Sequence, residues 1–228
     1  NGQVEKKLVN YFFLLIIIAG AVIMIFPYFF MFSGALKPDE EFYARAQSLI
    51  PHRLAFENFR KGWARAPFTR YMLNSFYIAS MQVLVVVLIG SLAGFAFAKY
   101  SFPGRNILFI IALSGLMIPF HARIIPLFLL MRDLNWLDTY WGIVIPGLAN
   151  AFALFLTKQY METIPTELIE AARIDACSDL RIFFTIILPL SKPALAVVGI
   201  FTFLGSWNNF LWPLIILHSQ EKLTVPLG

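Results

Sequence analysis

The sequence has little charge. Charged residues make up 14% of its 228 residues, whereas a soluble globular domain carries about a quarter. Hydrophobic residues make up 59%, and 24 residues are Phe. This composition excludes an ordinary soluble domain and predicts an integral membrane protein. The net charge of +5 comes with no basic run or patterned basic helix, so no nucleic-acid partner is expected.

Cysteine and histidine are also scarce. The single Cys177 excludes an internal disulfide and a cysteine metal cluster, and the three histidines are scattered along the chain. There is no His-Glu-x-x-His, no Gly-x-Ser-x-Gly and no phosphate-cradling Gly-rich loop. We therefore expect no catalytic residue, no metal site and no bound cofactor. Any energy from ATP has to be supplied by another subunit.

Long apolar runs dominate what is present. A bilayer-spanning helix needs about 20 apolar residues, and its backbone groups must be hydrogen-bonded within the helix. The first run is too long for a signal-peptide core, so it is read as an uncleaved span. Five spans are predicted, at 11–33, 73–98, 107–129 with a polar interruption, 140–157 and 194–217.

Proline and glycine are expected to shape these spans. Gly90 and Gly94 lie four apart on one helical face and predict a close approach of two helices. The Pro103-Gly104 pair predicts a type II turn in the loop after the second span. Prolines that should kink or loosen the helices are Pro27, Pro119, Pro146 and Pro213.

Ionisable residues are missing from four of the five predicted spans. The third span holds His121 and Arg123, which we place near its outer end. Because ion-coupled transporters keep ionisable groups inside their spans, coupling through buried carboxylates has little support.

Uncharged polar residues interrupt the fifth span. Amides hydrogen-bond sugar hydroxyls and an indole packs on a pyranose ring, so these residues are candidates for a substrate pathway. The alternative, which we weigh more heavily, is that the asparagines only bond neighbouring helices. The candidates are Trp207, Asn208, Asn209 and Trp212, with Gln82, Asn150 and Thr202 as weaker ones.

A charged, helix-forming segment lies between two apolar runs, at 158–192. We predict that Thr166 caps a helix beginning at Glu167, and that Glu170 and Arg173 pair on one face. A bend should follow at 175–179, and then a second helix through Ile186. The plain alternative is an ordinary surface helix between two spans.

The small residues Ala171 and Ala172 leave this first helix open to close approach by another surface. With Glu170, they resemble the EAA loop of ABC-importer permeases, and the wider chain is similar to the carbohydrate branch of the maltose and glycerol-phosphate type. Further motifs that carry the resemblance are Asn74-Ser75, Ala96-Phe97-Ala98-Lys99, Phe102-Pro103-Gly104-Arg105, Met117-Ile118-Pro119, Ile125-Pro126, Asp138-Thr139, Gln159, Ile164-Pro165, Ile187-x-Pro189 and Trp207-Asn208.

This resemblance implies an all-α integral membrane protein with the ABC type I importer permease fold. It implies five transmembrane helices of an expected six, the last lying beyond this chain, plus a cytoplasmic coupling helix. The expected parts are a first helix with an external loop at 1–72, and a transmembrane domain at 73–228 with its coupling loop at 158–192. The family usually has Gly where this chain has Ala176.

The resemblance also implies partners and site residues. The partners are a second homologous permease, two ATPase subunits that bind ATP and Mg²⁺, an extracytoplasmic solute-binding protein and membrane lipid. Leu188 and Pro189 should support the coupling loop. Residues expected to couple to an ATPase are Glu167, Glu170, Ala171, Ala172, Arg173, Asp175 and Ala176.

The implied location is a bacterial-type cytoplasmic (inner) membrane, with the EAA loop in the cytoplasm. The Lys and Arg counts of the loops run slightly against the positive-inside tendency and leave the orientation open, so the placement rests on the resemblance. Two other functions stay open: an ABC permease for a peptide, polyamine or phosphate ester, and a channel or scaffold subunit with no motor.

Overall fold

The computed structural model describes residues 2–44 and 48–228, with side chains at 6, 7, 9–44 and 48–228. The chain divides into two compact units, Asn1–Ala66 and Pro67–Gly228, and each is described by itself. The described residues form helices joined by turns and loops, with no strand among them.

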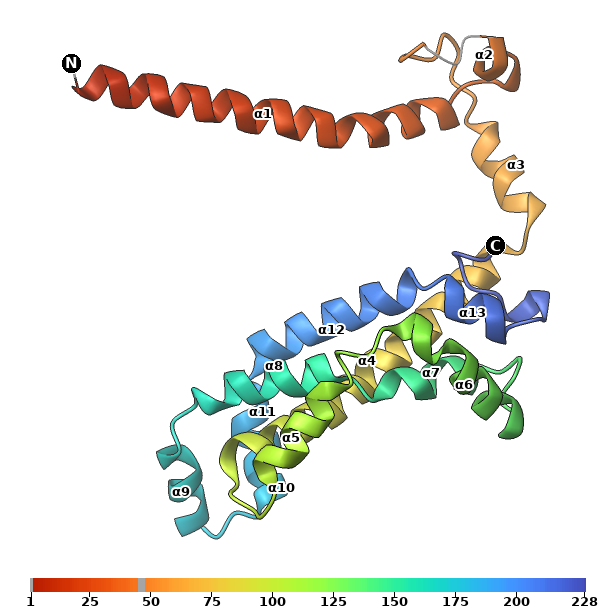
Figure 1. Cartoon of the computed structure of the whole chain (residues 1–228). Coiled ribbons are helices and arrows are strands. Elements are labelled where there is room, and N and C mark those ends of the chain that lie inside the picture. The colour runs from red at the N-terminus through yellow and green to blue at the C-terminus, as the bar shows by residue number, and fades with distance from the viewer. Residues whose placement is uncertain (1, 45–47) are drawn as a thin grey trace. The chain divides into compact units, whose positions relative to one another are not determined.

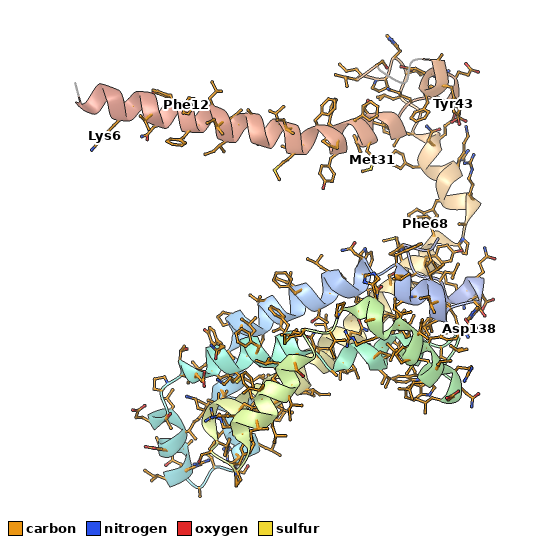
Figure 2. The ribbon with its side chains drawn as sticks, in the orientation of Figure 1. Lys6, Phe12, Met31, Tyr43, Phe68 and Asp138 are labelled. Atoms are coloured by element: carbon orange, nitrogen blue, oxygen red, sulfur yellow. The ribbon has the colours of Figure 1, made fainter. Side chains whose placement is uncertain are left out.

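The first unit consists of α1 (Gly2–Ala35), α2 (Asp39–Ala44) and α3 (Glu57–Arg65). The apolar part of α1, Val9–Ala35, is long enough to cross a membrane, and an 18-residue apolar window within it has no buried residue. Figure 2 shows its side chains, Phe12 and Met31 among them, standing out on all sides. Such a helix needs an apolar surrounding along its length, which a bilayer supplies.

A polar clasp joins the end of α1 to the segments that follow it. The Ser33 hydroxyl donates to the carbonyl of Leu49 at 2.5 Å. The side-chain amide of Asn58 donates to the carbonyls of Ala35 at 3.1 Å and Lys37 at 2.7 Å. The bond from Asn58 to Ala35 satisfies a carbonyl that the last turn of α1 leaves unpaired.

The second unit is built around α4 (Phe68–Lys99), the second helix long and apolar enough to span a membrane. The helices α8 (Ala151–Glu162) and α12 (Lys192–Trp207) pack along it, with α5 (Arg105–Ser114) beside α8. In Figure 1, α9 (Glu167–Ile174) lies at one end of this bundle. The helices α6 (Phe120–Asp133) and α13 (Leu211–Ile216) lie at the other.

The predicted close approach at Gly90 and Gly94 is confirmed. A Cβ added to Gly90 would lie 2.9 Å from Cβ of Ala153 on α8, and one added to Gly94 would lie 2.2 Å from Oγ1 of Thr157. The Thr157 hydroxyl donates to the carbonyl of Gly90 at 2.9 Å. The two helices therefore pack backbone to backbone, fastened by a buried hydroxyl.

Three of the five predicted spans consist of two helices each. The sequence predicts an interruption in 107–129 and in 194–217, so only 140–157 is wrong as an uninterrupted run. The run 107–129 divides into α5 and α6 around 115–119, and 194–217 divides into α12 and α13 at 208–210. The run 140–157 divides into α7 (Trp141–Leu148) and α8, which meet at 40°. Two of the breaks coincide with a residue that favours the start of a new helix: Pro119 precedes α6, and the side chain of Asn150 caps α8.

The predicted type II turn at Pro103-Gly104 is confirmed. Gly104 has φ 79° and ψ 2°, the left-handed conformation that this turn needs at its third residue. The amide of Arg105 donates to the carbonyl of Phe102 at 3.2 Å and closes the turn. Arg105 then begins α5.

The second predicted helix of the charged segment extends beyond Ile186. It runs as α10 (Asp179–Ile182), a π-helical turn η1 (Phe183–Ile187) and α11 (Leu188–Leu190). The chain then bends by 79° into α12. A π-helical turn inserts one extra residue into the helix and rotates the residues after it.

Candidate functional site

The helix α9 begins at Glu167, as predicted, but Thr166 does not cap it with its side chain. Instead, the Thr166 carbonyl accepts from the amides of Ile169 at 2.9 Å and Glu170 at 3.1 Å. Glu167 and Glu170 lie in the first turn, where the helix dipole favours negative charge.

One face of α9 is anchored in the second unit. Ile169 is 2% exposed and Ala172 is 7% exposed. Both belong to a buried cluster with residues of α4, α8, α10 and η1, against which Leu188 also packs. Pro189, the other predicted support residue, is exposed. The cluster comprises Phe95, Met161, Ile164, Ile169, Ala172, Ile182, Phe183 and Ile187.

The prediction that Ala172 is open to another surface is therefore wrong. Its methyl group faces the chain's own core, since the 3.6-residue period that exposes Ala171 turns the next position inward. Small size at Ala172 permits α9 to lie close to the bundle. The outer face consists of exposed residues, namely Glu167, Leu168, Glu170, Ala171, Ile174 and Asp175.

The predicted pair of Glu170 with Arg173 is also wrong. The Arg173 guanidinium pairs with the Asp179 carboxylate at 3.2 Å and lies over the Tyr100 ring, 5.4 Å from its centroid. Arg173 thus links α9 to α10 and to the end of α4. Within the part of the chain that the structure describes, the carboxylate of Glu170 forms no ion pair and accepts no hydrogen bond.

Ala176 has φ +56°, in the left-handed region. Its amide donates to the carbonyl of Arg173, and the amide of Cys177 donates to the carbonyl of Ala172, both at 3.0 Å. This is the Schellman arrangement, which usually places Gly at the left-handed position. The Ser178 hydroxyl then caps α10 by accepting from the amide of Arg181 at 3.4 Å.

A polar network occupies the other end of the bundle, around Asp138 in the loop before α7 (Figure 2). One carboxylate oxygen accepts from the amides of His218 and Ser219, both at 3.0 Å. The other accepts from the Ser219 hydroxyl at 2.5 Å and from Nζ of Lys222 at 3.0 Å. Burial alone would raise the pKa of Asp138, but these four donors hold it well below its usual range.

A cavity of about 600 Å³ lies between α4, α5, α6, α7, α8 and α13. Asn209 and Trp212 line it, as do the weaker candidates Gln82 and Asn150. Arg123, at the start of α6, also lines it. The sequence pointed to Arg123 as a charge within a span but not to the cavity, because the walls come from six separate helices.

The other predicted pathway residues lie outside this cavity. The Asn208 side chain donates to the carbonyl of Leu204 at 2.9 Å, and Trp207 stacks on Phe203 with ring centroids 5.6 Å apart. Asn208 and Trp212 do not lie on one helix, because α12 ends at Trp207 and α13 begins at Leu211. Asn209 lies just before α13, and its side-chain oxygen accepts from the Trp212 amide at 3.4 Å.

Over the described ranges, no group of three His, Cys, Asp or Glu side chains is placed to hold a metal ion.

Comparison with known proteins gives a direct assignment. Residues 60–227 match the family described as the inner membrane component of binding-protein-dependent transport systems.

The chain belongs to this family. The permease is 39% identical over 211 residues to the arabinooligosaccharides transport system permease protein AraQ of Halalkalibacterium halodurans, covering 91% of this chain and 76% of that protein. It is 38% identical over 218 residues to the sn-glycerol-3-phosphate transport system permease protein UgpE of Escherichia coli K12, covering 93% and 78%.

A solved structure agrees with this assignment. The permease matches a chain of a bacterial ABC transporter involved in the import of the acidic polysaccharide alginate. The TM-score is 0.88 at 27% identity, covering 98% of this chain and 78% of the other. The predicted all-helical ABC permease fold is confirmed.

Family membership also confirms the predicted class of function. The permease is a non-catalytic transport component of an inner membrane system, and the ATPase is a separate subunit. A solute-binding protein is the other partner that this type of system requires.

Proposed function

We propose that this permease forms part of the translocation pathway for a sugar or sugar derivative in an ATP-driven importer. The observation that carries the proposal is the family match over residues 60–227, together with relatives that transport arabinooligosaccharides and sn-glycerol 3-phosphate. A second, homologous permease completes the pathway. The exposed apolar surfaces of α1 and of the bundle are suited to lipid and to that subunit.

The outer face of α9 is the proposed docking surface for one of two ATPase subunits, which bind ATP and Mg²⁺. The proposal is supported by two features of α9: its inner face is buried against the bundle, and its outer face is exposed. Ile174 is 86% exposed, and the carboxylate of Glu170 is free to meet a basic residue. This docking places the α9 end of the bundle in the cytoplasm.

The packing of α9 against the helix bundle explains how force passes from the ATPase to the membrane domain. The cluster beneath α9 includes Phe95 of α4 and Met161 of α8, so displacement of α9 moves the two helices that the glycines hold together. ATP-driven closure of the ATPase pair then swings these helices as one body between inward-facing and outward-facing states.

Replacing Glu170 tests the docking. We expect Glu170→Gln, in the assembled transporter, to weaken recovery of the ATPase with the tagged permease and to lower ATP-driven sugar uptake about tenfold, since a charge-assisted bond is lost. The matched control is Glu40→Gln, an exposed glutamate of α2. Both variants should insert into the membrane at wild-type levels.

Equal loss of ATPase recovery in both variants would contradict the docking role of Glu170. Full uptake by Glu170→Gln would contradict it as well. A permease that copurifies with no ATPase at all would remove the importer assignment and leave a channel or scaffold.

A further inference from the structure

The cavity between α4, α5, α6, α7, α8 and α13 is rich in hydrogen-bond donors. Its walls are mainly apolar, and none of the lining residues that the structure describes is acidic. The polar side chains that reach it are Arg123, Gln82, Asn150 and Asn209. The chemistry of the cavity therefore depends on which ends of the three amides are free.

Two of the amides have their oxygens engaged. The side-chain oxygen of Asn150 accepts from the amide of Ala153 at 3.0 Å, and that of Asn209 accepts from the amide of Trp212 at 3.4 Å. Their NH₂ groups have no acceptor among the described residues, so both present donors. The NH₂ group of Gln82 donates to the carbonyl of Ile143 at 3.1 Å, which leaves its oxygen as a single acceptor.

Arg123 adds a permanent positive charge. Its guanidinium lies 5.9 Å from the centroid of the Phe120 ring, and no carboxylate in the described ranges pairs with it. It is the fourth residue of α6, where the helix dipole also contributes positive potential. Arg132 on the same helix differs, because it pairs with Asp133 at 2.9 Å and lies outside the cavity.

We propose that this cavity is a subsite for the anionic group, carboxylate or phosphate, of a charged sugar derivative, with Arg123 as its counter-ion. A neutral sugar needs both donors and acceptors for its hydroxyls, whereas an oxyanion only accepts. An anion on the transport path supplies the counter-ion that Arg123 lacks among the described residues. The inference rests on the proposed import function and narrows its substrate to anionic sugars.

A lipid headgroup carries the same phosphate chemistry, and Arg123 is exposed in this chain. The cavity favours a transported solute over a lipid headgroup. Arg123 lies on α6, and Asn150 and Asn209 supply further donors from other walls of the cavity. The experiment must nevertheless separate the two sources of anion.

The test uses the complete transporter with its solute-binding protein in proteoliposomes of phosphatidylcholine, with or without phosphatidylglycerol. The probes are sn-glycerol 3-phosphate, an alginate oligosaccharide and the neutral arabinotriose. We expect uptake of at least one charged probe. Arg123→Gln should lower that uptake about tenfold or more, and Arg123→Lys should lower it less, since it keeps the charge. Arg132→Gln should leave it near the wild-type rate.

Uptake of the neutral probe alone by the wild type would overturn the anionic subsite and leave the import function standing. Equal losses for Arg123→Gln and Arg132→Gln, or unchanged uptake in Arg123→Gln, would overturn the subsite too. An Arg123 effect seen only with phosphatidylglycerol would assign the side chain to lipid. Absence of ATP-driven uptake of all three probes would overturn the import function and the subsite with it.

Discussion

Ala176 shows how one side chain sets the strain of the loop after α9. Its left-handed φ of +56° costs an L-residue with a Cβ roughly 1–2 kcal/mol relative to Gly. We expect Ala176→Gly to relieve this strain and to stabilise the loop by about 1 kcal/mol, part of the gain being offset by the larger entropy of Gly in the unfolded chain. Hydrogen exchange of the amides at 172–178 measures the change.

The control for this substitution is Ala171→Gly, five residues earlier within α9. Gly in a helix interior is destabilising by about 1 kcal/mol, so exchange in the same helix should become faster. Slower exchange in both variants, or in neither, would show that φ at Ala176 does not limit the stability of the loop.

The lowered pKa of Asp138 predicts that the stability of the folded permease depends on pH. Its bonds favour the ionised carboxylate, so the folded-state pKa lies below the ordinary value of 3.8. The stabilisation is complete above that value and declines as the pH falls below it. We expect Asp138→Asn, which tolerates the left-handed φ of 52°, to lose about 2 kcal/mol at neutral pH.

Thermal unfolding in nanodiscs at several pH values measures this effect. The gap in melting temperature between wild type and Asp138→Asn should narrow as the pH is lowered from 6 to about 3. A gap that stays constant would show that the charge of Asp138 does not stabilise its hydrogen bonds with Ser219 and Lys222.

At the scale of elements, the contact of α4 with α8 decides the packing of the bundle. A Cβ at Gly94 would lie 2.9 Å from the backbone nitrogen of Lys158, which cannot move away as a flexible side chain can. We expect Gly94→Ala to destabilise the second unit by about 1–3 kcal/mol. The control is Gly205→Ala on α12, where nothing lies within 4 Å and better helix propensity should stabilise the helix slightly.

Unfolding of the detergent-solubilised permease in a denaturant series compares the two variants. A Gly94→Ala protein as stable as wild type would mean that α4 and α8 separate easily, against the buried bond from Thr157 to Gly90.

The boundaries of some helices could not be predicted from the sequence. An apolar run is compatible with one long helix or with two short helices at an angle, because both bury the same composition. The α7–α8 bend falls at Asn150, whose side chain caps α8. By contrast, the Pro103-Gly104 turn was predictable, because its local φ and ψ requirements admit few other residues.

At the scale of the whole molecule, one face of α9 packs against the bundle while the opposite face stays exposed for a partner. Ala172→Glu would bury a charge in the cluster with Ile169 and Phe183, so we expect misfolding or loss of the α9 seat. Ala171→Glu lies on the exposed face and should leave the fold intact while lowering ATPase recovery and uptake.

Size-exclusion profiles and ATPase pull-down of the assembled transporter distinguish the two effects. Wild-type folding of Ala172→Glu would contradict the buried placement of that residue. Wild-type uptake by Ala171→Glu would show that the partner does not approach this part of α9.

The sequence by itself determined the membrane environment, the helical class, the α9 segment and its family, because composition and short-range backbone preferences are written directly in the order of residues. Only the tertiary structure decided that Ala172 faces inward, that Arg173 pairs with Asp179, and that Arg123 shares a cavity with two donor amides. Those outcomes depend on which helices meet at which angle, and that is fixed by contacts between residues far apart in the chain.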